Sequence, residues 1–166
     1  MAGNLVQGAL FTVMVVRAGM LGDPAFAHEL ASRRALAVYD DARFKEIGFG
    51  AWEGRTASEI GRDVPGALGR FWDDPVGNTP PGAEPLPVFY ARVVAAWTDL
   101  LARHRGTHVL VVCHAGVVRA CASHVLGVPL DRLFRIKVPN AGITRIAVSH
   151  HGNSQFPALL FHAGSL

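Results

Sequence analysis

The sequence predicts an α/β domain with a mostly parallel sheet flanked by helices. The first observation is the unbroken apolar run Val109–Cys113, typical of a strand buried on both faces of a parallel sheet. The run stops at His114, and apolar residues then recur at helical spacing from Val117 until Gly127, where a helix would end. The second observation is that short apolar runs alternate with helical segments along the chain. His114 therefore falls at the carboxyl end of a strand, where open α/β sheets bind ligands and where helix N–H groups suit an anion.

The first third of the chain predicts two strands, a helix and a long loop. Phe11–Val16 is apolar and β-branched, as expected for a strand, and Arg17-Ala18-Gly19 follows as a turn. Residues from Pro24 to Arg34 have helical composition, and Leu36–Tyr39 fits a short strand. Asp40–Gly54 is rich in glycine and aromatic residues, which predicts a loop.

The middle of the chain predicts three helices and one surface excursion. Thr56-Ala-Ser-Glu59 is a capping box, so a helix begins after Thr56, and a second short helix holds Leu68, Phe71 and Trp72. Asp74–Pro87 contains five of the ten prolines and predicts an excursion over the surface. A long amphipathic helix then runs to about Arg103, and its predicted buried face is Phe89, Val93, Ala96, Trp97, Leu100 and Leu101.

The C-terminal part predicts a short helix and two more strands. Gly127–Phe134 fits a turn and a short helix, Ile143–Val148 alternates as a strand does, and Leu159–His162 fits a final edge strand. No repeat or linker interrupts the sequence, so we expect one domain over residues 1–166, with an atypical N-terminal part over residues 1–25.

Composition excludes several classes of protein. Charged residues are 17% and hydrophobic residues 50% of the 166 residues, which excludes a disordered chain. The formal net charge of +3 comes from scattered basic residues, which argues against nucleic-acid binding and suits a small anionic substrate. Cys113 and Cys121 lie in apolar surroundings and are expected to be small buried hydrophobic residues. Without a disulfide framework or a zinc motif, this cysteine usage predicts the cytoplasm.

The N-terminal part has only some of the features of a targeting signal. Ala9–Val16 is apolar and Ala25-Phe26-Ala27 has the form of a cleavage site, but no Lys or Arg precedes the apolar run. We therefore expect neither a signal peptide nor a membrane-spanning segment, and no membrane among the partners.

Three stretches, taken together and in order, resemble the histidine phosphatases, the phosphoglycerate mutase-like superfamily. They are Arg43–Arg55, the pair Trp72–Pro75 and Pro80–Pro85, and Val109–Arg119. The resemblance is closest to the α-ribazole phosphatase branch and covers about residues 26 to 148. It implies a phosphoglycerate mutase-like fold and the hydrolysis of phosphomonoesters, or mutase-like phosphoryl transfer, without metal or cofactor. The implied partner is a small phosphorylated substrate or phosphate, chosen by the variable lid within residues 72–87.

The resemblance also implies roles for single residues. His114 takes the place of the family's second histidine, and Glu46 that of the acid that protonates the leaving oxygen. The amides of Ala115 and Gly116 are expected to cradle the phosphate, and Arg17 is the candidate arginine for its oxygens. In this family a nucleophilic histidine within Arg-His-Gly accepts the phosphoryl group, which suits neutral imidazole chemistry. From the residues alone, Glu53 is expected to bond loop amides.

The chain contains no Arg-His-Gly triplet, and two alignments account for this. In the first, Val15–Gly19 is the motif and Ala18 replaces the nucleophile, but the interval to Glu46 is short for the family. In the second, which the spacing favours, Thr12–Val16 belongs to the family's second strand–helix unit and Phe26–Leu36 to its end. The chain then lacks the first strand and helix, and the exposed slot is filled by the apolar run Ala9–Val16 or covered by a homodimer.

Two functions follow from the resemblance and its departures. One is a metal-free phosphatase, and the other is a degenerate member that binds anions or partners without turnover. A different nucleophile such as His28 has no motif to support it.

Overall fold

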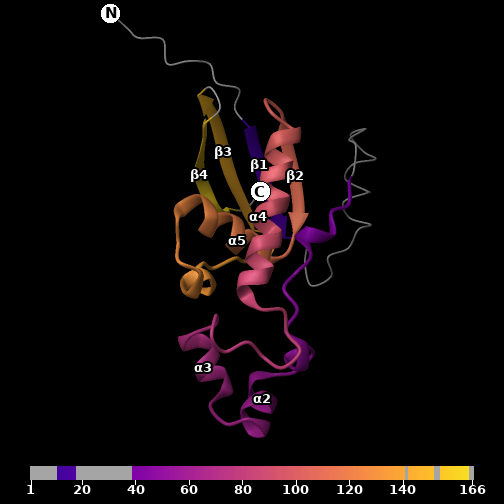
Figure 1. Ribbon diagram of the computed structural model, residues 1–166, viewed down its shortest axis with the longest axis vertical. Helices are drawn as coiled ribbons and strands as arrows, with labels where there is room; N and C mark the ends of the chain where they lie inside the picture. Colours follow the sequence, from indigo (N-terminus) through magenta and orange to yellow (C-terminus); the bar gives the residue numbers. More distant parts are fainter. Residues whose placement is uncertain (1–10, 18–38, 141, 152–153, 165–166) are drawn as a thin grey trace, which may run out of the picture.

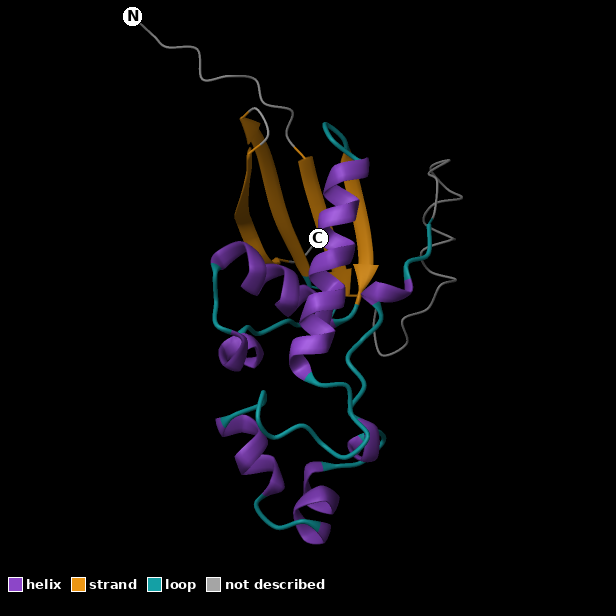
Figure 2. Cartoon of the chain, viewed as in Figure 1, coloured by secondary structure: helices purple, strands orange, loops and turns teal. Residues whose placement is uncertain are grey.

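A computed structural model describes residues 11–17, 39–140, 142–151 and 154–164 of the chain. The predicted helix Pro24–Arg34 lies outside the described residues. So does the predicted strand Leu36–Tyr39, except Tyr39, which is in a loop. Two helices, α4 (Leu86–Arg103) and α5 (Ala115–Leu126), pack on a four-stranded sheet (Figures 1 and 2). Two short helices, α2 (Ala57–Asp63) and α3 (Ala67–Asp73), form a separate lobe beyond one end of the sheet (Figure 1).

The strand order in the described sheet is β2-β1-β3-β4. The strands are β1 (Phe11–Arg17), β2 (His108–Cys113), β3 (Ile143–His151) and β4 (Ser154–Gly164). β1 runs parallel to β2 and antiparallel to β3, and β3 runs antiparallel to β4.

The α/β class is therefore confirmed, but the described sheet is mixed rather than mostly parallel. β3 starts beside the carboxyl end of β1, where Ile143 pairs with Val16, so it runs back along β1. A hairpin then joins β3 to β4, with His151 paired to Ser154, and such a short connection forces antiparallel pairing.

β1 occupies an interior position between β2 and β3. Thr12 pairs with His108 on one side and with Ala147 on the other. Phe11–Arg17 thus has a hydrogen-bonded strand on each side within the part of the sheet that the structure describes.

The prediction that Val109–Cys113 is buried on both faces is wrong for most of the strand. Cys113 is buried, Val109 and Val111 are half-buried, and Leu110 is 38% exposed. The reason is that β2 has a single neighbouring strand in the described sheet, so its side chains have fewer packing partners.

The predicted helices between Thr56 and Gly127 are confirmed with their termini. The Thr56 hydroxyl accepts a hydrogen bond from the Glu59 amide at 3.2 Å, and the Thr56 amide donates to the Glu59 carboxylate at 2.7 Å. Gly127 ends α5 in the left-handed conformation, with φ of 65°. The remaining short helices are 3₁₀ turns, η1 (Ala42–Phe44), η2 (Gly50–Trp52) and η3 (Leu130–Arg135).

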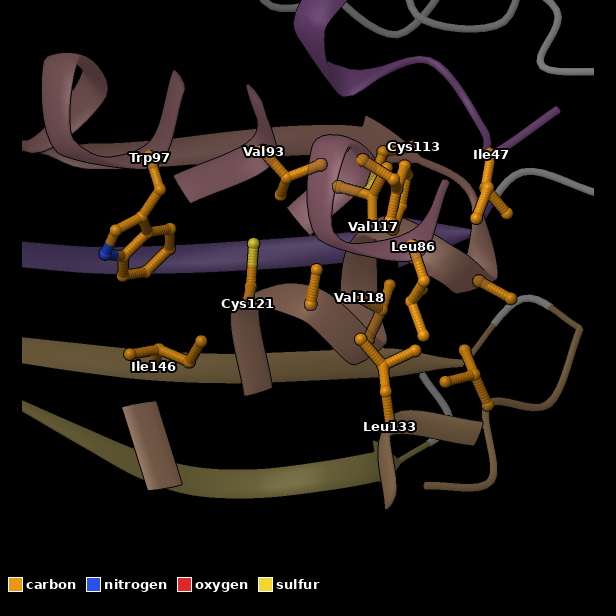
Figure 3. Close-up of a cluster of buried hydrophobic side chains, with 14 of the residues drawn as sticks. Ile47, Leu86, Val93, Trp97, Cys113, Val117, Val118, Cys121, Leu133 and Ile146 are labelled. Atoms are coloured by element: carbon orange, nitrogen blue, oxygen red, sulfur yellow. The ribbon is translucent and has the colours of Figure 1, made fainter. Parts of the chain in front are cut away.

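A hydrophobic core lies between the sheet and the two long helices (Figure 3). We call hydrophobic core the buried residues of α4, α5, β2 and β3 in that contact, which include Phe89, Val93, Trp97, Cys113, Val117, Val118, Cys121, Ile146 and Val148. The predicted face of α4 is confirmed except at Leu100, which is half-buried. Both cysteines are buried and free, as expected, and burial raises the pKa of the Cys121 thiol to about 12. None of the helices in the described ranges is long and apolar enough to cross a membrane.

Candidate functional site

The candidate site lies where β1 and β2 end together. Arg17, the last residue of β1, pairs with Cys113, the last residue of β2. His114 follows directly with extended backbone and is the N-cap residue of α5. Its ring is half-buried and has no hydrogen-bond partner among the described residues. The strand ends therefore bring Arg17 and His114 to one edge of the sheet.

Glu46 reaches this edge from a loop far away in the sequence. Both of its carboxylate oxygens accept the Gly116 N–H, at 3.1 and 3.2 Å, and Oε1 also accepts the Ile47 N–H at 3.1 Å. The carboxylate thus lies against the first turn of α5, where the helix dipole stabilises negative charge. Glu46 therefore contacts the first turn of α5 at Gly116, two residues after His114 in the sequence.

Gly116 permits this contact because it has no side chain. A Cβ at this position would lie 2.1 Å from Oε1 of Glu46 and 3.2 Å from the Phe89 ring. The Gly116 amide, expected to cradle phosphate, donates to Glu46 in this structure. A bound phosphate would share or replace that hydrogen bond.

The loop that carries Glu46 is fastened to the proline-rich excursion. Glu53 accepts the Phe49 N–H at 2.9 Å, which confirms its expected structural role. The Ala51 N–H donates to the Pro81 carbonyl at 2.9 Å. Gly50 has a φ of +54°, and a Cβ there would lie 2.4 Å from the backbone of residues 81–83.

An aromatic cluster joins this loop to the lobe of α2 and α3. Its members are Phe49, Trp52, Phe71, Trp72 and Phe134. The ring of Phe71 lies 5.4 Å from those of Trp52 and Phe134, centroid to centroid, while Trp72 is 60% exposed. The cluster therefore lies between the Glu46 loop and solvent.

Arg92, which was not among the residues predicted for the site, contacts the Glu46 loop from α4. Its guanidinium donates to the Glu46 carbonyl oxygen at 3.2 Å. The available signal was an arginine next to the predicted buried face, three residues after Phe89 and one before Val93. The described residues contain no group of three or more His, Cys, Asp or Glu placed to hold a metal ion. Ala18, Gly19 and His28 lie outside the described residues, and of Arg17 only the backbone is described.

Comparisons with known proteins define the class. Residues 25–156 match the model of the histidine phosphatase superfamily (branch 1). The chain belongs to this superfamily, and the predicted resemblance is confirmed over nearly the predicted residues.

Two curated relatives are phosphatases by name. Phosphoserine phosphatase 1 of Hydrogenobacter thermophilus is 29% identical over 127 residues, 76% of this chain and 60% of that protein. The glucosyl-3-phosphoglycerate phosphatase of Mycolicibacterium vanbaalenii is 31% identical over 110 residues, 61% of this chain and 48% of that protein. The chain thus spans about half to three fifths of the length of these relatives.

Solved structures share the fold. A mycobacterial glucosyl-3-phosphoglycerate phosphatase in complex with VO3 has a TM-score of 0.76 and 25% identity, over 92% of this chain and 77% of that chain. The α-ribazole phosphatase of Shigella flexneri has a TM-score of 0.67 and 22% identity, over 83% of this chain and 66% of that chain.

Proposed function

We propose that this chain binds the phosphoryl group of a small phosphomonoester at the carboxyl ends of β1 and β2. The observation that carries the proposal is the contact of the Glu46 carboxylate with the Gly116 N–H, two residues after His114. An acid and an imidazole at the start of a helix are a suitable pair for a phosphate ester. The helix amides and His114 bind the phosphoryl oxygens, and Glu46 faces the ester oxygen.

The remaining contacts come from residues at the same edge. Arg17 is the candidate for a forked contact to two phosphoryl oxygens, since it ends β1 beside Cys113. The Ala115 and Gly116 amides are the proposed backbone donors. Fixed donors of this kind stabilise charge on phosphoryl oxygens without a metal ion. The names of the curated relatives support small phosphomonoesters as the ligand class.

A specific observation favours binding without phosphohistidine turnover over a working phosphatase. In the alignment that places the motif at Val15–Gly19, Arg17 is followed by Ala18 where the resemblance calls for histidine, and in the other alignment the motif is absent from the chain. Among the described residues, His108 lies at the opposite end of β2, and the His162 ring is bonded to Thr144 Oγ1 at 2.8 Å and to the Lys137 carbonyl at 2.5 Å. Neither is placed to act as a nucleophile beside His114.

Binding and turnover are tested on the same purified chain. Titration with inorganic phosphate and with phosphoserine is expected to give saturable binding that His114→Ala weakens at least about tenfold, a loss of roughly 1.4 kcal/mol. His108→Ala, on the same strand at its other end, is the matched control and should leave affinity unchanged. An aryl phosphate should give neither product nor acid-labile phosphohistidine.

Two results would overturn these statements. Absence of phosphate binding by the folded chain contradicts the site. Turnover that is lost in His114→Ala contradicts the non-catalytic function and establishes a phosphatase.

A further inference from the structure

The Arg92 guanidinium uses all five of its N–H donors within the described structure. Nε and Nη2 donate to the two carboxylate oxygens of Glu84, each at 2.7 Å, as a forked ion pair. Nη1 donates to the carbonyl oxygens of Arg43 at 2.7 Å and Lys45 at 2.8 Å, and Nη2 also donates to that of Glu46 at 3.2 Å. One side chain therefore fixes three carbonyl groups within four residues of the Glu46 loop.

The Arg92 side chain packs on a buried neighbour in α4. Arg92 lies on α4 one turn after Phe89, which is completely buried, and its Cζ lies 4.8 Å from the centre of the Phe89 ring. The Arg92 and Glu84 side chains are 23% and 22% exposed, so solvent screens the ion pair only in part. The Glu84 N–H also donates to the Gly48 carbonyl at 2.9 Å. The loop is thus held at residues 43–46 by Arg92 and at residue 48 by Glu84.

We propose that Arg92 is a positioning residue for Glu46. By fixing the carbonyls of residues 43, 45 and 46, the guanidinium sets the backbone from which the Glu46 side chain reaches the Gly116 amide. Arg92 itself contacts neither His114 nor the Gly116 amide. The inference rests on the proposed function only in giving Glu46 a chemical role.

Lysine cannot replace Arg92 in this arrangement. Its ammonium group has three donors on one nitrogen, without the planar fork that serves a carboxylate and several carbonyls at once. Arg92→Lys keeps the charge and leaves at least two of the five hydrogen bonds unmade. It therefore tests geometry rather than net charge.

The experiment measures the Gly116 amide directly, by its NMR chemical shift and its hydrogen-exchange rate. In Arg92→Lys we expect the Gly116 resonance to move and its exchange to become about five to ten times faster, as for one lost hydrogen bond. Glu46→Ala, which removes the acceptor of the Gly116 N–H, should change the same resonance. Arg55→Lys is the matched control, because Arg55 pairs with Asp63 in α2 and donates to the Glu59 carbonyl, away from the Glu46 loop.

A double-mutant cycle separates positioning from general loosening of the fold. If Arg92 acts through Glu46, Arg92→Lys adds nothing at Gly116 once Glu46→Ala has removed the acceptor of its N–H. An unchanged Gly116 amide in folded Arg92→Lys, or an effect of equal size in the Glu46→Ala background, would overturn the proposal. If Arg92→Lys does not fold, Glu84→Gln carries the same test, with a smaller change in the same direction expected and no change overturning the proposal. A chain that binds no inorganic phosphate contradicts the proposed function and leaves this readout intact.

Discussion

The hydrophobic core and the aromatic cluster hold two parts of the molecule together in different ways. In the core, Val93 and Ile146 are fully buried between the helices and the sheet (Figure 3), and Phe89 of α4 is fully buried as well. In the cluster, Phe71 is buried but Trp72 is 60% exposed, and several rings meet edge to face. The core side chains are thus shielded from solvent, whereas the cluster includes one ring that is mostly exposed.

The candidate site is held by the helices of the hydrophobic core rather than by the lobe of α2 and α3. Glu46 is joined to the first turn of α5 through Gly116, and its loop is held by Arg92 of α4. The lobe of α2 and α3 reaches the rest of the chain through ring contacts such as Phe71 on Phe134. We therefore expect changes in the lobe to leave the contact between Glu46 and Gly116 in place.

The largest effect is expected from Phe89→Ala. Removing a fully buried aromatic side chain costs about 3–5 kcal/mol, and here it also removes the ring beneath Arg92. Trp72→Ala, in the exposed part of the cluster, should cost about 1 kcal/mol. Urea unfolding of both variants measures the difference. Equal losses of stability in the two variants would show that the cluster is packed as tightly as the core.

The second prediction compares two helical glycines. Gly116→Ala should destabilise the chain by about 1–3 kcal/mol and abolish phosphate binding, because the new Cβ collides with the Glu46 carboxylate. Gly61 lies in α2 with no atom within 4 Å of a Cβ, so Gly61→Ala should stabilise by about 0.5–1 kcal/mol. Thermal unfolding and phosphate titration measure both. If both substitutions changed the stability in the same direction, the close contact between Gly116 and Glu46 would be contradicted.

The third prediction concerns the start of α2 and its dependence on pH. Thr56→Ala should cost about 1 kcal/mol near neutral pH through loss of the cap. Hydrogen bonds from the Thr56 amide, which has the larger effect, and from its hydroxyl lower the pKa of Glu59. Stability from this pair is therefore present above the pKa of Glu59 in the unfolded chain and is lost as pH falls through its lower value in the folded chain. Unfolding at neutral and acidic pH should give a smaller cost for Thr56→Ala in acid, and a cost that grows in acid would refute this.

The smallest effect is expected for the alkylation of the two buried thiols, which measures whether the hydrophobic core opens in the folded chain. Burial raises the pKa of Cys113 and that of Cys121, so neither forms thiolate readily. At about pH 8, where a free thiol begins to ionise, an alkylating reagent should leave the folded chain unmodified and modify both thiols after unfolding. Mass spectrometry counts the adducts. Rapid modification of the folded chain would show that the core opens locally.

Local patterns predicted much of this structure. The apolar run that ends at His114 and the capping box at Thr56 are each only a few residues long, and both predict their elements correctly. The pairing of Glu46 with the first turn of α5 came from a family resemblance across three motifs.

These local patterns could not predict contacts between segments that are far apart in the sequence. The interior position of β1 depends on which strands flank it, and apolar residues alone do not encode neighbours. The position of Arg92 beside the predicted buried face did not reveal its role, because its five hydrogen bonds end on Glu84 and on backbone carbonyls, whose positions no local pattern predicts. The exposure of β2 likewise follows from its single neighbour in the described sheet.

The interior position of β1 also sets an order of assembly. β1 precedes both of its partners in the chain, and Thr12 pairs with His108 while Phe11 pairs with Val148. Contacts between such distant residues form slowly, because a long loop must close before they are made. Both edges of β1 therefore stay unpaired until β2 and β3 have been synthesised. During that interval the unpaired edges of Phe11–Arg17 are open to incorrect pairing and aggregation.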